Sequence, residues 1–294
     1  MRARAAGPGT AAGLAGLAVI AAAVLLAGAV LPHGPLEMDL SRSLQPPSGA
    51  HLFGTDAFGR DVLARVLHGG RVSLAVGLVA RSIALLLGLA AGTAAGYFGG
   101  RTDALVMRLA DVTFAFPTLL LLIAIMAVVT PGLWALCAAL GAVGWAAMAR
   151  LVRGQILAVR EREYVQAARA AGAGHLRLIA RYILPQCLSP LIVVFTLGLG
   201  MTIMAEASLS FLGLGVQPPA PSWGGMIAAG IPFMRTAPWL TLFPGLVLTA
   251  TILAFNLVGD GLRDALDPRS PLARRRAGRV AGDGAAPARA GGVR

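Results

Sequence analysis

Six long apolar runs constrain this chain more than any other feature of its sequence. They occupy residues 11–31, 72–97, 111–130, 133–152, 187–212 and 238–259. A helix of about 20 apolar residues is long enough to cross the hydrocarbon core of a bilayer. The pattern predicts an all-α membrane protein with six transmembrane helices and both termini on the same side of the membrane.

The composition agrees with this prediction. Only 13% of the residues are charged, whereas soluble domains average about 25%. The first run follows Arg2 and Arg4, and it is longer than the apolar core of about 7–15 residues in a cleaved signal peptide. We therefore expect residues 11–31 to be a retained membrane anchor.

Arginine accounts for all 25 basic residues, and its distribution predicts the orientation of the bundle. With the N-terminus inside, 19 arginines fall in inside segments and five in outside segments, while Arg81 lies within the second run. An excess of this kind marks the cytoplasmic side of membrane proteins. Both termini, and the segment between the fourth and fifth runs, are expected to be cytoplasmic. The net charge of +12 follows this topology and predicts no nucleic-acid partner.

The absence of lysine excludes one class of catalyst. A P-loop needs a lysine to reach the nucleotide phosphates, so conventional P-loop hydrolysis of ATP has to come from another chain. Cys137 and Cys187 are isolated from each other and fit neither a metal site nor a disulfide framework. We interpret both as small apolar residues.

Three regions are expected along the chain. Residues 1–71 hold the anchor and an extracytoplasmic amphipathic segment, residues 72–268 form a five-helix core with a loop at 154–186, and residues 269–294 form a disordered basic tail. Within the first region, residues 55–70 predict an amphipathic helix on the outer surface or packed on the bundle. Gly69 and Gly70 are expected to end it.

The loop at 154–186 contains an ordered pattern. One helical face is predicted to carry a tyrosine and three small residues, Tyr164, Ala167, Ala168 and Ala171, opposite Arg162, Gln166 and Arg169. Gly172 and Gly174 then break the helix. A small face with one aromatic residue suits docking into a protein groove, whereas helices that lie on lipid present bulky apolar residues. A helix that only connects two spans, with its arginines in water, explains the same pattern equally well.

A second short helix is predicted after the glycines. Its apolar face holds Leu176, Ile179, Ala180 and Ile183, its polar side holds Arg177 and Arg181, and Pro185 is expected to end or kink it.

The loop resembles a motif of ABC-importer permeases: Gln166-Ala167-Ala168, three residues, Gly172, ten residues, then Ile183-Leu184-Pro185. Gln166 stands where that motif usually has glutamate. Residues 51–74, 205–227 and 259–269 resemble, in the same order, segments of the C-type permeases of dipeptide, oligopeptide, nickel and glutathione importers.

This resemblance implies a type I importer permease fold and a multi-pass protein of the cell membrane. It implies a non-catalytic subunit without cofactor, which forms half of a translocation pathway. The implied partners are a second permease, two ATP-binding subunits, an extracytoplasmic substrate-binding protein and the lipid bilayer. The residues expected to couple to an ATP-binding subunit are Tyr164, Gln166, Ala167, Ala168, Arg169, Gly172, Leu184 and Pro185.

Two acids near the apolar runs are further candidates, because an ionisable group inside a span is a functional candidate by default. Glu206, with Ser210 nearby, is expected either to line the pathway or to bridge helices. Asp111 is expected to pair with Arg108. Trp223 is expected to meet the binding protein, to gate the pathway or to anchor at the membrane interface. No metal site is predicted, because His51, His68, Asp56 and Asp61 match no standard ligand spacing.

Three other classes of function fit the sequence less well. A proton-coupled secondary transporter using Asp111 and Glu206 would be expected to show internal repeats, and the chain has no convincing one. An intramembrane hydrolase is disfavoured, because no Gly-x-Ser-x-Gly occurs and all four histidines lie outside the apolar runs. A scaffold without transport leaves the loop motif unexplained.

The arginine distribution gives the first testable prediction. An alkaline phosphatase fusion truncated after residue 170 is expected to be inactive, because that enzyme matures only outside the cytoplasm, while a fluorescent protein at the same position is expected to be fluorescent. Fusions after residue 50 are the matched control and should behave in the opposite way. An active phosphatase at residue 170 contradicts the orientation.

Overall fold

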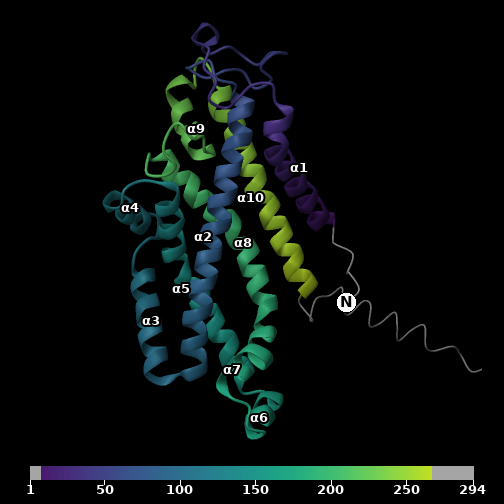
Figure 1. The fold of residues 1–294 in the computed structure, drawn as a ribbon, viewed down its shortest axis with the longest axis vertical. Helices are drawn as coiled ribbons and strands as arrows, with labels where there is room; N and C mark the ends of the chain where they lie inside the picture. Colours follow the sequence, from purple (N-terminus) through teal and green to yellow (C-terminus); the bar gives the residue numbers. More distant parts are fainter. Residues whose placement is uncertain (1–7, 267–294) are drawn as a thin grey trace, which may run out of the picture.

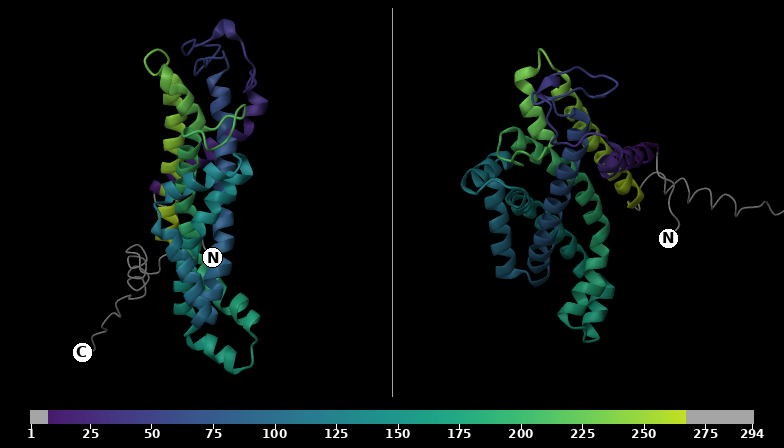
Figure 2. Two further views of the ribbon diagram at one scale, coloured as in Figure 1. Left: turned by 90° about the vertical axis from the view of Figure 1, so that its left-hand side faces the viewer. Right: turned by 45° about the horizontal axis from the view of Figure 1, so that its top comes forward.

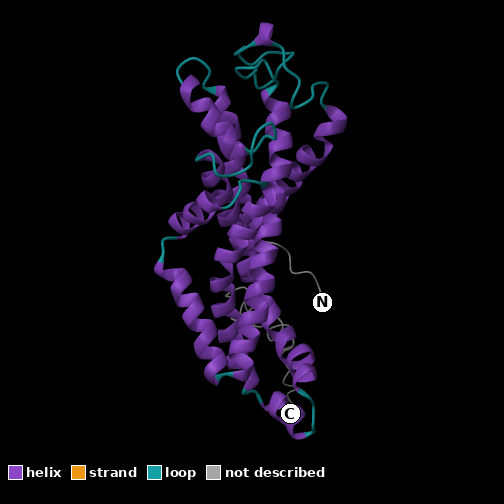
Figure 3. Ribbon diagram, turned by 60° about the vertical axis from the view of Figure 1, so that its left-hand side comes forward, coloured by secondary structure: helices purple, strands orange, loops and turns teal. Residues whose placement is uncertain are grey.

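The computed structural model describes residues 8–266, which form an elongated bundle of helices (Figure 1). No strand occurs among the described residues, as the secondary-structure view shows (Figure 3). The long elements are α1 (Pro8–Val30), α2 (Val62–Phe98), α3 (Gly100–Ala115), α4 (Thr118–Val128), α5 (Leu133–Arg160), α8 (Leu184–Phe211) and α10 (Trp239–Leu266). The short ones are η1 (Leu40–Arg42), α6 (Glu163–Ala170), α7 (His175–Arg177), η2 (Leu178–Ile183), α9 (Trp223–Gly230) and η3 (Ile231–Phe233).

Five of the six predicted membrane-spanning helices are confirmed in approximate position. Within residues 8–266, five helices are long and apolar enough to cross a membrane, and a sixth span results if α3 and α4 are counted together. Several helices extend beyond their apolar runs. For example, α5 continues to Arg160, because a helix can project past the hydrocarbon where its side chains become amphipathic. The predicted tail at 269–294 lies outside the described residues.

The third predicted span, a helix over 111–130, is not one continuous helix. The chain forms α3, which ends at Ala115, and α4, which begins at Thr118, and the two are bent by 91°. Pro117 causes the break, since proline disfavours the helical conformation in the residue before it. Phe116 is accordingly extended, with φ −103° and ψ 138°.

The expected helix end at Gly69 and Gly70 is also wrong. Helix α2 begins at Val62 and continues through both glycines to Phe98. Asp61 starts it by accepting a hydrogen bond at 2.8 Å from the Ala64 amide, the preferred N-cap arrangement. The two glycines instead allow close packing, because a Cβ on Gly70 would lie 2.9 Å from the Trp223 ring.

Helices α2 and α5 meet along a seam of glycines. Gly88, Gly92 and Gly96 recur every fourth residue of α2 and therefore share one face. A Cβ on Gly92 would lie 2.5 Å from the Ala149 carbonyl oxygen of α5. Small residues allow membrane helices to approach this closely, and the gain is van der Waals contact between backbones.

Helix α1 packs against α10 and is fixed by a residue of α2. The Arg71 guanidinium donates two hydrogen bonds of 2.8 Å, to the carbonyl oxygens of Val24 and Leu25. These carbonyls lie in the last turns of α1, where a cation interacts favourably with the helix dipole. The predicted anchor is thereby joined to the core of the bundle (Figure 2).

The glycine seam predicts the effect of one substitution. Gly92→Val should destabilise the bundle by about 1–3 kcal/mol, the usual cost of overpacking, because its branched side chain would meet the α5 backbone. The thermal unfolding midpoint of the purified protein measures this. Gly154→Val is the matched control, since Gly154 is exposed and has open space around it. Equal midpoints for the two variants would contradict the seam.

Candidate functional site

The loop between α5 and α8 forms one end of the bundle, farthest from α9 (Figure 1). Helix α6 crosses this end as a separate short helix, and a turn at residues 171–174 leads into α7. A helix of eight residues is too short to be stable alone in water. Contacts with the rest of the chain must therefore hold α6 in place.

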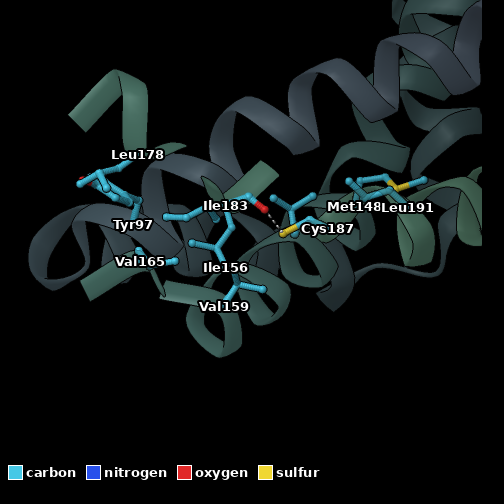
Figure 4. Packing of buried hydrophobic residues seen from close by; sticks show 10 residues of the cluster. Tyr97, Met148, Ile156, Val159, Val165, Leu178, Ile183, Cys187 and Leu191 are labelled. Carbon is cyan, nitrogen blue, oxygen red and sulfur yellow. Dashed lines mark hydrogen bonds between the residues drawn. The ribbon is translucent and has the colours of Figure 1, made fainter. Parts of the chain in front are cut away.

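Helix α6 has one fully buried residue, Val165. This residue belongs to a hydrophobic cluster with Tyr97 of α2, Ile156 of α5, and Leu178 and Ile183 of η2 (Figure 4). The cluster continues to Cys187 and Leu191 of α8. Helix α6 is thus fixed to three long helices through one apolar core. The sequence pattern missed Val165, because a single apolar residue in two helical turns gives no periodicity.

The opposite side of α6 is open. Tyr164 is 39% exposed, and Ala167, Arg169 and Ala171 are exposed as well, whereas Ala168 is partly buried against the cluster. Of the predicted small face, Tyr164, Ala167 and Ala171 are exposed, whereas Ala168 is not. Arg169 is exposed as well, but it lies on the side of Val165, because residues four apart in a helix share a face. This exposed surface of Tyr164, Ala167 and Ala171 is called the α6 outer face below.

Gly172 ends α6 in the predicted way. Its φ is +82°, a left-handed conformation that glycine adopts without steric cost. The Gly172 amide donates to the Arg169 carbonyl and the Ala173 amide donates to the Ala168 carbonyl, both at 3.0 Å. This pair of bonds is the Schellman motif, and it fixes the direction in which the chain leaves α6.

Gln166 contacts the end of α5. Its side-chain amide nitrogen donates a hydrogen bond of 3.1 Å to the Arg160 carbonyl oxygen. A deprotonated glutamate could not make this contact, because it has no proton to donate. The departure from the usual motif therefore has a structural role here, in joining α6 to α5.

The second short helix differs from its prediction. Leu176 is 81% exposed, while Leu178 and Ile183 are buried. The apolar face is shifted because η2 is a π-helical stretch, in which each turn holds more residues than in an α-helix. Pro185 does not end the helix, since the helix continues from His175 to Phe211. Leu184 and Pro185 form the first turn of α8.

A hydrogen bond joins this region to α2. The Tyr97 hydroxyl and His175 Nδ1 lie 2.8 Å apart, and their rings meet edge to face. Neither residue was singled out from the sequence, where they are 78 positions apart.

Glu206 and Ser210 lie inside the subunit near the far end of α8, away from α6. Glu206 is fully buried, and its Oε1 accepts a hydrogen bond of 2.7 Å from the Ser210 hydroxyl. Among the described residues Oε2 has no hydrogen-bond partner. Such burial places both side chains between helices of this subunit.

The pairing predicted for Asp111 is wrong, and so is one of the three alternatives for Trp223, the interfacial anchor. Asp111 pairs with Arg150 of α5 at 2.7 Å and not with Arg108. Trp223 is fully buried and donates a hydrogen bond of 2.9 Å to the Val66 carbonyl oxygen of α2, so it is not an interfacial anchor. Both partners are distant in sequence, where periodicity gives no information about contacts.

Comparisons with known proteins agree with this architecture. Residues 84–270 match the family of binding-protein-dependent transport system inner membrane components. The dipeptide transport system permease protein DppC of Alkalihalophilus pseudofirmus is 46% identical over 233 residues, which cover 79% of this chain and 77% of the relative. The glutathione transport system permease protein GsiD of Pectobacterium atrosepticum is 44% identical over 231 residues, 79% of this chain and 77% of the relative.

A solved structure shows the same fold. A chain of the inward-facing MetNI methionine ABC transporter superposes with a TM-score of 0.56 at 18% identity, over 69% of this chain and 96% of the other. The predicted importer-permease fold is thereby confirmed.

The buried side of α6 predicts a stability effect. Val165→Ala should cost about 2 kcal/mol, from the lost burial of two methyl groups and the cavity that remains. Hydrogen exchange of residues 161–174 should increase because α6 opens more often. Ala171→Ser, on the α6 outer face, is the control and should leave exchange unchanged. Unaltered exchange in Val165→Ala would show that Val165 is not the anchor.

Proposed function

The chain belongs to the family of binding-protein-dependent transport system inner membrane components, and we propose that it imports peptides. It is a multi-pass permease of the cell membrane and works within an ABC importer. The observation that carries the proposed cargo is 46% identity to a dipeptide permease over 79% of the chain. Glutathione is a second candidate, because a glutathione permease is 44% identical over the same share.

The proposed assembly contains a second permease subunit, two ATP-binding subunits and an extracytoplasmic binding protein. The permease supplies half of the pathway, and the ATP-binding subunits hydrolyse ATP. The absence of lysine from this chain supports that division, since a P-loop requires one.

The α6 outer face is proposed to dock on an ATP-binding subunit at the cytoplasmic end of the bundle. A tyrosine beside small residues offers a shallow apolar surface, and the exposed Arg169 adds a charge at its side. The sequence left two interpretations of α6 open, a docking helix and a simple connector, and they differ in how firmly α6 has to be attached to the bundle. A solvated connector needs no rigid attachment, whereas α6 has a buried core and a fixed end.

Motion of α6 is proposed to reach the transmembrane helices by two connections. The first is the cluster around Val165, which includes residues of α2, α5 and α8. The second is the hydrogen bond between Tyr97 and His175. Closely packed interiors transmit displacement because they have little free volume. Rocking of packed halves about a central pathway is the general form of alternating access.

Gly172 provides the test of both cargo and coupling. The full transporter, reconstituted in vesicles with its binding protein, is expected to accumulate a radiolabelled dipeptide when ATP is supplied. Gly172→Val should insert normally but lose most of the uptake relative to ATP hydrolysed. A β-branched residue at φ +82° costs about 1–3 kcal/mol, and this strain would redirect α6.

Gly174→Val is the matched control. Gly174 also has open space around it, but its φ is −66°, so valine is tolerated there. Normal coupling in Gly172→Val contradicts the docking role of α6. Failure of the unmodified transporter to accumulate any dipeptide contradicts the proposed cargo.

A further inference from the structure

A cavity of about 130 Å³ lies at the end of the bundle opposite α6. It is bordered by the start of α2 and by α9, η3 and the start of α10, near the top of Figure 1. Its volume is comparable to that of an engineered cavity of about 150 Å³ that binds benzene. A group the size of one amino-acid side chain therefore fits inside.

One wall of the cavity carries a net positive charge. The Asp56 carboxylate lies 2.7 Å from Arg60 Nε and 3.5 Å from Arg65 Nε. All three side chains are mostly buried, with exposed fractions of 14%, 13% and 11% respectively. Two guanidinium groups thus face one carboxylate. Burial of an excess charge is costly unless a partner compensates it.

The carboxylate of Asp56 already accepts three hydrogen bonds from this chain. Its Oδ1 accepts hydrogen bonds from the Phe58 and Arg60 amides, and its Oδ2 accepts one from Arg60 Nε. Arg65 Nη1 donates to the Pro35 carbonyl oxygen at 3.0 Å. Three terminal nitrogens, both of Arg60 and Nη2 of Arg65, have no hydrogen-bond partner within residues 8–266. They can still donate to an anion.

The opposite wall is apolar. It is formed by Met226 of α9, Phe233 of η3 and Leu240 of α10. Methionine is flexible and adapts to groups of different shape. The cavity thus combines arginine donors that have no hydrogen-bond partner among the described residues with an apolar recess.

We propose that this cavity binds a carboxylate carried beside an apolar side chain. Arginine matches the planar carboxylate with two parallel hydrogen bonds, and the apolar side chain enters the recess of Met226, Phe233 and Leu240. Two sources present this chemistry at the outer end: the C-terminal residue of a peptide, and an exposed residue of the binding protein. This choice of sources rests on the proposed function.

Direct binding to the intact transporter tests the proposal. The complex, in nanodiscs of phosphatidylcholine and without the binding protein, is titrated with the dipeptide Ala-Leu and with its C-terminal amide. The acid should bind about tenfold or more tightly than the amide, since a hydrogen bond to a charged group is lost. Arg60→Gln should abolish this preference, and Met226→Trp should block binding of both by filling the recess.

Arg235→Gln is the control, because Arg235 is exposed and does not border the cavity. The unfolding midpoint of each variant is measured in parallel. If Met226→Trp is unstable, Arg60→Gln alone decides the outcome, since it removes one charge from a wall where Arg65 still pairs with Asp56.

A second titration separates the sources. If free Ala-Leu does not bind, but Arg60→Gln and Met226→Trp weaken docking of the binding protein about tenfold, the binding protein supplies the carboxylate and the proposal stands. Equal affinity for acid and amide, with docking unchanged, overturns it. Retention of phosphatidylglycerol alone, lost in Arg60→Gln, also overturns it in favour of a lipid site. ATP-driven dipeptide uptake by the unmodified transporter, measured alongside, shows whether the proposed cargo fails separately.

Discussion

The contact between α2 and α5 is the constraint on which most of this structure depends. Glycines at every fourth position of α2 let the two backbones approach until no side chain fits between them. The hydrophobic effect gives little drive for association inside a membrane, so close van der Waals contact has to supply it. The seam ends beside Tyr97 and Ile156, which belong to the cluster that holds α6. The position of the loop therefore follows from the packing of the spans.

Much of the fold could be predicted from the sequence, because its main signals are local. Apolar length fixes the spans, and a glycine after a short helix fixes the end of α6, as the positive φ of Gly172 shows. The loop motif identified the family that the comparisons then showed. Pro117 is visible in the sequence, but some membrane helices tolerate a proline inside an apolar run. The residue alone therefore does not show whether the helix breaks there.

The parts that could not be predicted depend on contacts between distant residues. Val165 is the buried residue of α6, but one valine in two helical turns gives no periodicity that would predict its burial. Arg150 replaced Arg108 as the partner of Asp111 because α5 lies alongside α3. The π-helical stretch at Leu178–Ile183 changed which leucine is buried. In the first two cases the neighbour belongs to another helix, and a single sequence contains no signal for that contact.

The two ends of the bundle have different chemistry: one carries the short helix α6 and the other the cavity beside Asp56. At the α6 end, the inner side of a short helix is buried and its outer face is left open, which suits the proposed role of receiving force from another chain. A flexible attachment would dissipate that force, and the Schellman bonds after α6 together with the Tyr97–His175 bond reduce such flexibility. At the other end, Asp56 neutralises only one of two arginines. A fully paired wall would be more stable without a ligand, so the unpaired donors there are more consistent with binding than with structural support alone.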